Sequence, residues 1–262
     1  MPTATATLPT SASPAWQQSL PPAVARAVWR GDDLSRRVER TSSSGWDALD
    51  AELPGAGWPI GSITEVLTAQ PAVLEWRLLA PALHPIAKAG GEIVVVSPPQ
   101  HPHVPGLLQV GLNERRFIWI RAEAPAERMW VTEQLIKSNS AGAVIAWLPK
   151  ARPEQLRRLQ VCALSSQSLV FICRPELARR ESSAAPLRVH ASVGLDWELH
   201  VHLFKRRGPS HERPLTLSSV PGGLASVLTT RVREPSRLMF PEFGHAVDSI
   251  AVAPRPRRHA TV

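Results

Sequence analysis

The sequence predicts an α/β protein with a doubly wound, mainly parallel sheet and antiparallel strands added at one edge. Two observations lead to this fold class. Apolar runs of strand length alternate with single helical segments through the middle of the chain, and three later runs follow one another without helices between them. Strands joined by single helices require right-handed crossovers, which make neighbouring strands parallel and place helices on both faces.

Five apolar runs are expected to form the parallel strands. Residues 92–97 are typical of them, because three consecutive valines lie between a glycine pair and a proline pair. Such a continuous apolar run indicates a strand that is covered on both faces. The five runs are residues 62–67, 92–97, 117–120, 143–148 and 168–173.

Helices are expected between these strands. The first covers residues 72–89, where Pro81 and Pro85 should kink or shorten it. The second covers residues 126–138, and the third begins at Pro153, where the missing N–H has little cost. Three alternating runs then predict the antiparallel edge strands, at residues 187–190, 196–204 and 214–217.

The composition divides the chain into a core and two end segments. Residues 1–40 are rich in Thr, Ala, Ser and Pro, and we expect a mobile segment with a short amphipathic helix over residues 24–38. Residues 41–230 are the expected core domain. Residues 231–262 are rich in Arg and Pro and predict a basic, disordered tail.

The charge and the apolar content limit the classes of function. A formal net charge of +8 favours a polyanionic partner such as nucleic acid, although a solvated, arginine-rich surface explains it as well. No run of 18 apolar residues and no leader-like N-terminus is present, so we expect a cytoplasmic protein without membrane contact.

Several segments resemble the core of the RecA recombinase. The stretch SSSGWDALDAELPGAGWPIGSITEVL, at residues 42–67, resembles the segment that leads into the first RecA strand and its phosphate loop. Later segments follow in the same order, among them FIWIRA, AGAVIAWLP and PLRVHASVGLDWELHVHLFKRR. The resemblance covers residues 41 to 217 and implies a RecA-like core.

The residues that a phosphate loop needs are absent from the matching positions. A phosphate loop uses glycines, a lysine and a Ser or Thr hydroxyl to hold phosphates and magnesium. Here Thr68 and Val73 occupy the glycine positions, Leu74 the lysine position and Glu75 the magnesium-ligand position. Trp147 stands where RecA has a magnesium-side carboxylate. We therefore expect no catalysis and no nucleotide cofactor.

The failed phosphate loop, the segment SPPQHPHVPGLLQVGL and the segment AVARAVWRGDDL together resemble the ImuA family, whose members are sometimes labelled SulA-like. The resemblance implies an accessory role in SOS-induced mutagenic translesion DNA synthesis. The implied partners are an inactive, ImuB-like relative of the Y-family polymerases, an error-prone C-family polymerase complex, or RecA. A SulA-like inhibitor of cell division and a residual DNA-dependent ATPase are the alternatives.

Five arginines are candidates for non-specific DNA binding. They flank the ends of the fourth and fifth expected strands, at the sheet edge where open parallel sheets bind ligands. A solvated helix face and loop is the competing interpretation. The candidates are Arg157, Arg158, Arg174, Arg179 and Arg180.

Large apolar residues in the two end segments are candidates for partner binding. Trp29 lies on the expected N-terminal helix, and an apolar cluster lies before the basic tail. Apolar anchors in such segments order on a partner's groove, although Phe240 and Phe243 could equally cover the protein's own sheet edge. The C-terminal candidates are Leu238, Met239, Phe240 and Phe243.

The remaining tryptophans and histidines predict packing rather than chemistry. Trp119, Trp130 and Trp147 fall in expected strands or a helix and should fill the core, with Trp147 closing the vacated nucleotide position. His200 and His202 share a strand face, but no further ligand follows at fixed spacing, so we expect no metal site.

Overall fold

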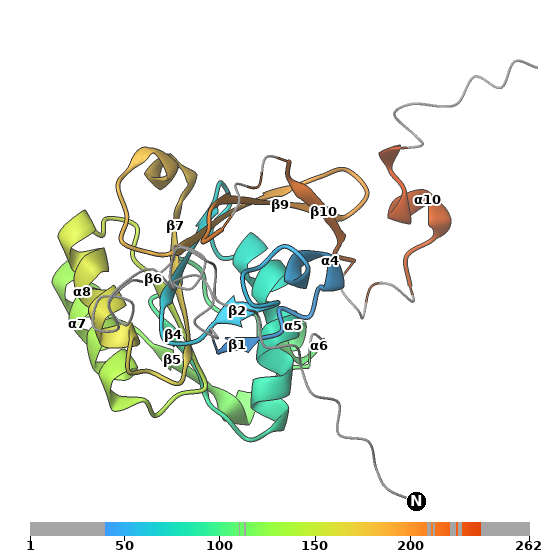
Figure 1. The fold of residues 1–262 in the computed structure, drawn as a ribbon. Helices are drawn as coiled ribbons and strands as arrows, with labels where there is room; N and C mark the ends of the chain where they lie inside the picture. Colours follow the sequence, from blue (N-terminus) through green and yellow to red (C-terminus); the bar gives the residue numbers. More distant parts are fainter. Residues whose placement is uncertain are drawn as a thin grey trace, which may run out of the picture.

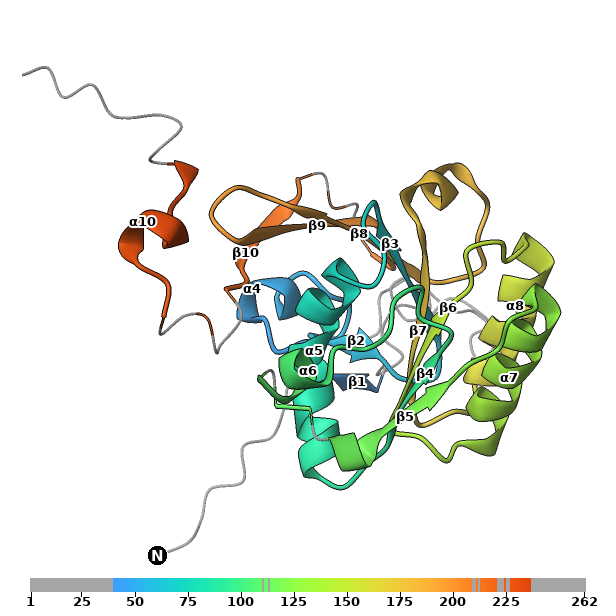
Figure 2. The same cartoon turned by 180° about the vertical axis from the view of Figure 1, so that it is seen from behind.

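The computed structural model describes residues 40–109, 111–112, 114–208, 211, 213–220, 224 and 227–236. Within them the chain forms a mixed α/β structure around one eight-stranded sheet (Figures 1 and 2). Trp29 and the apolar cluster at residues 238–243 lie outside the described residues, as do residues 1–39 and 237–262 in full.

The strand order of the large sheet is β10-β9-β8-β3-β7-β6-β4-β5. From β8 to β5 all neighbouring strands are parallel, whereas β9 and β10 continue the sheet antiparallel. The strands are β3 (Ile63–Thr68), β4 (Ile93–Val96), β5 (Phe117–Ile120), β6 (Ala143–Trp147), β7 (Leu169–Pro175), β8 (Leu187–Val193), β9 (Glu198–Lys205) and β10 (Leu215–Ser218).

The antiparallel extension differs from the expectation in one respect. The strand β8 pairs with β9 antiparallel, yet it is parallel to β3, with Val66 opposite Val189. The connection from β7 to β8, residues 176–186, returns the chain to the edge at which the parallel strands begin. It therefore allows β8 to run parallel to β3 without an intervening α-helix. Only β9 and β10 are therefore antiparallel additions.

Helices cover the two faces of the parallel part. Figure 1 shows α5 (Leu74–Lys88) on one side of the sheet and α7 (Pro125–Ser138) with α8 (Pro153–Ala163) on the other. Alternate strand residues divide accordingly, because Val66 and Phe171 pack in the cluster that includes α5, whereas Ile63 and Ile172 pack with α7 and α8. This division is the one expected for strands with two buried faces.

Short elements complete the described residues. A small antiparallel sheet joins β1 (Thr41–Ser42) to β2 (Trp58–Pro59) before the main sheet begins. The others are α4 (Asp47–Asp50), α6 (Val104–Gln109), η1 (Glu114–Arg116), η2 (Glu176–Arg180) and α10 (Thr230–Arg233). None of the helices in the described residues has the length and apolar character needed to span a bilayer.

Helix α5 keeps both Pro81 and Pro85 inside its length, because apolar packing of its buried residues against the sheet outweighs the two lost backbone hydrogen bonds. Two expectations about tryptophans need correction. Trp119 is 39% exposed because β5 is the last strand of the sheet, and Trp130 is 61% exposed on the outer side of α7. Only Trp147 of the three tryptophans is buried in the core.

Candidate functional site

The loop between β3 and α5 occupies the position expected for a phosphate loop, and a buried carboxyl group lies at its centre. Glu75, in the first turn of α5, is 1% exposed. Its Oε1 accepts a hydrogen bond from Thr68 Oγ1 at 3.0 Å and another from Trp147 Nε1 at 3.2 Å. Three of the five residues expected here are thus in direct contact.

Burial dominates the electrostatics of this carboxyl group. Desolvation raises the pKa of Glu75, and the hydrogen bonds from its backbone, Thr68 and Trp147 oppose this only in part. Its second oxygen, Oε2, has no hydrogen-bond partner in the described part of the chain. The neighbouring Cys173 thiol is fully buried, and its pKa is raised well above the ordinary value by burial and by Glu75. These surroundings favour the neutral form of the Glu75 side chain.

Aromatic and aliphatic side chains fill the rest of this position. The Trp147 ring lies 5.6 Å from the Trp76 ring, and Trp76 lies 5.8 Å from Phe117. Leu74, at the expected lysine position, is 1% exposed in the apolar core, whereas Val73 is 51% exposed. The described loop residues therefore offer phosphate neither a cation nor a free hydroxyl.

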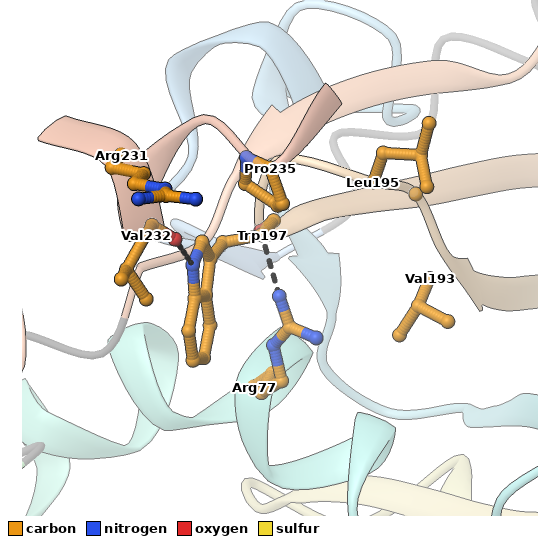
Figure 3. Close-up of a pocket in the computed structure, with 8 residues that line it drawn as sticks. Arg77, Val193, Leu195, Trp197, Arg231, Val232 and Pro235 are labelled. Atoms are coloured by element: carbon orange, nitrogen blue, oxygen red, sulfur yellow. Dashed lines mark hydrogen bonds between the residues drawn. The ribbon is translucent and has the colours of Figure 1, made fainter. Parts of the chain in front are cut away.

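A cavity of about 420 Å³ lies beside the same helix, between α5, the β8–β9 connection and the segment that contains α10 (Figure 3). Arg77 of α5 donates from Nη2 to the Trp197 carbonyl oxygen at 2.7 Å and also to Ser219 Oγ. The Trp197 indole donates to the Val232 carbonyl oxygen at 3.0 Å. These contacts hold the chain after β10 against the β8–β9 connection.

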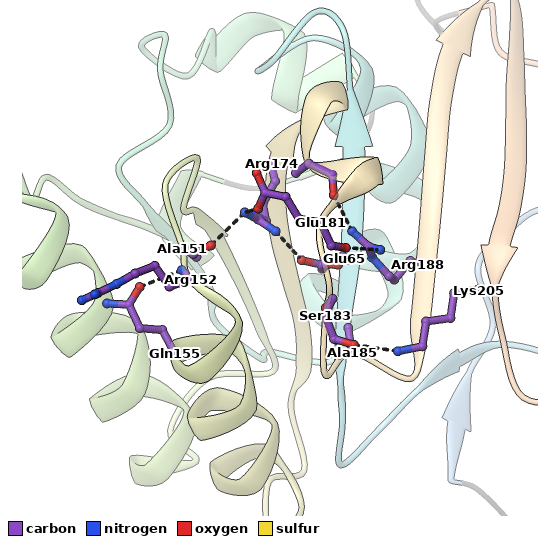
Figure 4. Close-up of polar contacts among 11 residues, drawn as sticks. Glu65, Ala151, Arg152, Gln155, Arg174, Glu181, Ser183, Ala185, Arg188 and Lys205 are labelled. Carbon is purple, nitrogen blue, oxygen red and sulfur yellow. Dashed lines mark hydrogen bonds and ion pairs between the residues drawn. The ribbon is translucent and has the colours of Figure 1, made fainter.

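A buried ion network crosses three neighbouring strands at the other face (Figure 4). Glu65, on the central strand β3, is fully buried. Its Oε1 accepts from Arg174 Nη1 at 3.1 Å, and its Oε2 accepts from Arg188 Nε. The parallel register places Arg188 directly opposite Glu65. One carboxylate thus lies between two guanidinium groups.

Further acceptors satisfy the two guanidinium groups. Arg174 Nη2 donates to Glu181 Oε2 at 2.6 Å and to the Ala151 carbonyl oxygen at 2.8 Å. Arg188 donates to the carbonyl oxygens of Glu181 and Ala178 at 3.0 and 2.7 Å. Arg174 is only 2% exposed, so it is not available to a DNA phosphate, which corrects its place among the DNA-binding candidates.

The other arginine candidates lie on two separate elements. Arg157 and Arg158 are exposed on α8, where Arg158 Nε contacts Glu133 of α7 at 2.7 Å. Arg179 and Arg180 are exposed on η2, and the Arg179 guanidinium lies 5.4 Å from the centre of the Phe204 ring. The four exposed candidates therefore lie on two elements, and within the described residues Arg157, Arg179 and Arg180 form no ion pair with a carboxylate.

Sequence reasoning missed Glu65, Arg188 and Phe204. A signal for the first two was present, because a charged residue inside an otherwise apolar strand indicates a buried ion pair. The pairing partner depends on strand order, which the pattern of one strand does not reveal. His200 pairs with Glu198 at 3.0 Å, and the described residues include no group of three or more side chains suited to a metal ion.

Comparisons with known proteins show a distant similarity to cell division inhibitors. No family model matches the chain. A cell division inhibitor SulA from Yersinia enterocolitica is 26% identical over 137 residues, which are 51% of this chain and 80% of that protein. Cell division inhibitors SulA from Yersinia pestis and Yersinia pseudotuberculosis are 23% identical over 133 residues, covering 50% of this chain and 79% of each. The chain is thus similar to SulA proteins over half its length.

Proposed function

We propose that the protein is a non-catalytic accessory factor of SOS-induced mutagenic translesion DNA synthesis, which acts by binding other proteins. The expected partners are an inactive relative of the Y-family polymerases, an error-prone C-family polymerase complex, or RecA. The resemblance of residues 41 to 217 to a RecA-like core, together with the ImuA-like segments, supports this role.

The contact of Trp147 with Glu75 is the observation that most favours a non-catalytic role. Phosphoryl transfer depends on a lysine and magnesium held against the phosphates. At the matching positions the chain has a buried leucine, a buried carboxyl group and a tryptophan that donates to it. An anionic phosphate brought to this position would meet a carboxyl group and no compensating cation.

Inhibition of cell division is the second candidate function. The similarity to cell division inhibitors SulA, at 23 to 26% identity over half of the chain, favours it. Under both candidates the protein works by contact with another protein in the cytoplasm and needs no cofactor. They differ in the process that the contact serves.

One experiment in cells separates the two candidates. Deletion of the gene should lower the frequency of mutations after DNA damage, because the error-prone complex would lack its accessory factor. Expression of the protein without damage should leave cell length unchanged. Filamentous cells on expression, with an unchanged mutation frequency in the deletion strain, would contradict the accessory role and support the inhibitor role.

A further inference from the structure

We propose that the cavity between α5, the β8–β9 connection and the α10 segment is a docking site for an extended segment of a partner protein, in which an apolar side chain lies next to acidic residues. This inference rests on the proposed role as a partner-binding protein and specifies the chemistry of the segment that is bound. Figure 3 shows the residues that line the cavity.

The walls of the cavity are apolar and accessible. Val193 at the end of β8 is 46% exposed, Leu195 of the β8–β9 connection is 52% exposed, and Val232 of α10 is 48% exposed. Trp197 and Pro235 complete the apolar lining. A volume of about 420 Å³ is within the range of about 300–1,000 Å³ that is typical of ligand pockets. Accessible aliphatic walls at one concave place favour an apolar anchor.

Hydrogen bonds fix these walls before any partner binds. The Trp197 indole donates to the Val232 carbonyl oxygen, and the Trp197 carbonyl oxygen accepts hydrogen bonds from Arg77 and Ser219. At the end of the α10 segment, the Ser236 backbone N–H donates to Asp196 Oδ1 at 2.8 Å. A cavity whose walls are already ordered requires less loss of conformational entropy on binding.

The charge of the lining selects an acidic partner. Arg77 and Arg231 line the cavity, and no acidic residue does. In the described part of the chain, neither arginine forms an ion pair with a carboxylate. Arg77 Nε is buried without a hydrogen-bond partner, and burial lowers the pKa of this guanidinium. A carboxylate beside the anchor would supply the missing counter-charge.

A peptide is favoured over single-stranded nucleic acid by the same lining. Proteins that bind single-stranded nucleic acid stack successive bases on several aromatic side chains along a positively charged groove. Here Trp197 is the one aromatic side chain in the lining, and most of the remaining wall is aliphatic.

Fluorescence anisotropy with a labelled peptide, acetyl-Asp-Asp-Leu-Phe-Asp-Asp-amide, tests the proposal on the full chain. Two control peptides replace either every Asp by Asn or the Leu-Phe pair by Ser-Ser. We expect the first peptide to bind, and both controls to bind at least about tenfold more weakly, which corresponds to about 1.4 kcal/mol.

Substitutions locate the binding on the protein. Leu195→Asp and Arg231→Glu each place a negative charge at an exposed position of the cavity, and each should weaken binding at least about tenfold. The matched controls are Leu177→Asp, at a leucine that is 79% exposed on η2, and Arg157→Glu on α8. Both controls should bind the peptide as the wild-type protein does. Thermal unfolding of each variant verifies that it is folded.

Several results would overturn the proposal. They are absence of peptide binding up to about 1 mM, equal binding of the Asn peptide, and equal loss in the control variants. Displacement of the peptide by oligo(dT) would assign the cavity to nucleic acid instead. Binding that occurs only after deletion of residues 237–262 would assign it to the chain's own C-terminal segment. Because the proposed function is tested by mutation frequency and cell length, its failure is distinguishable from a failure of this site.

Discussion

At the scale of single residues, the buried ion network of Glu65 with Arg174 and Arg188 is the feature of the core whose stability depends most on every partner being present. Glu65 and Arg174 are almost completely buried, and they form an ion pair at 3.1 Å. Removing one member of such a buried pair leaves an uncompensated charge, which is more harmful than loss of an exposed ion pair. The network therefore stabilises the fold only while all its members are present.

The substitution Glu65→Gln should lower the free energy of unfolding by about 3–5 kcal/mol, because Arg174 and Arg188 would lose their shared counter-charge. Urea unfolding of the purified variant measures this change. As a matched control, Glu123→Gln breaks the exposed ion pair with Arg121 and should cost less than about 1 kcal/mol. Equal effects of the two substitutions would show that the buried network has no special role.

Glu75 makes the stability of the protein depend on pH. Its pKa is raised by burial, so the native protein holds this proton more tightly than the unfolded chain does. The resulting stabilisation is complete below the pKa of the unfolded chain and is lost as the pH rises through the raised pKa of the native state. Gln at this position cannot ionise and should not show this loss.

We therefore expect Glu75→Gln to gain stability relative to the wild-type protein as the pH is raised from the acidic range to neutrality. Thr68 and Trp147 can still donate to the side-chain oxygen of glutamine. Urea unfolding of both proteins across this pH range provides the comparison. If the two stability curves ran parallel, Glu75 would not titrate abnormally in the native state.

At the scale of elements, the sequence pattern predicted the strands and helices well where apolar periodicity alone decides them. β5 and β6 lie where their apolar runs indicated, and α7 begins one residue before the expected start. The errors arose where tertiary packing decides the outcome. The position of β5 at the sheet edge exposes Trp119, and Trp130 lies on the exposed side of α7.

The short helix η2 is the element on which any DNA binding should depend. Within the described residues its two exposed arginines, Arg179 and Arg180, form no ion pair with a carboxylate, whereas Arg158 of α8 contacts Glu133. Replacing both η2 arginines by alanine should remove about one to two phosphate contacts and so make the slope of log DNA affinity against log salt concentration less steep. Arg158→Ala is the matched control and should change it less.

The measurement is the slope of log affinity against log salt concentration for a labelled oligonucleotide, determined for two unrelated base sequences. Contacts to phosphates predict the same slope for both sequences, because phosphate contacts do not read bases. Affinity that is insensitive to salt, or that differs strongly between the sequences, would place DNA recognition elsewhere on the protein.

At the scale of the whole molecule, the alternation of strands and helices was sufficient to predict a mainly parallel sheet but not all of the site. The place of residues 68–75 between the first parallel strand and the start of the next helix could be predicted, because they directly follow the first apolar run. The network of Glu65, Arg174 and Arg188 could not, since it requires the order of β7, β3 and β8 in the sheet. The cavity beside α5 also depends on contacts between distant segments, such as Arg77 with Trp197.

The account as a whole depends on the proposal that nucleotide chemistry is absent from this chain. If Glu75 and Trp147 fill the phosphate position, as we propose, ATP has no site there. If they do not, the partner-binding role loses its main support. Nucleotide binding is therefore the property that decides between an accessory protein and an ATPase.

Isothermal titration of the purified protein with ATP and magnesium, alongside a phosphate-release assay with and without single-stranded DNA, tests this claim most directly. We predict no binding with a Kd near or below about 1 µM and no hydrolysis, because Leu74 and Trp147 provide none of the charges that phosphate and magnesium need. A magnesium-dependent, DNA-stimulated ATPase activity that disappears when residues 68–75 are altered would contradict the account.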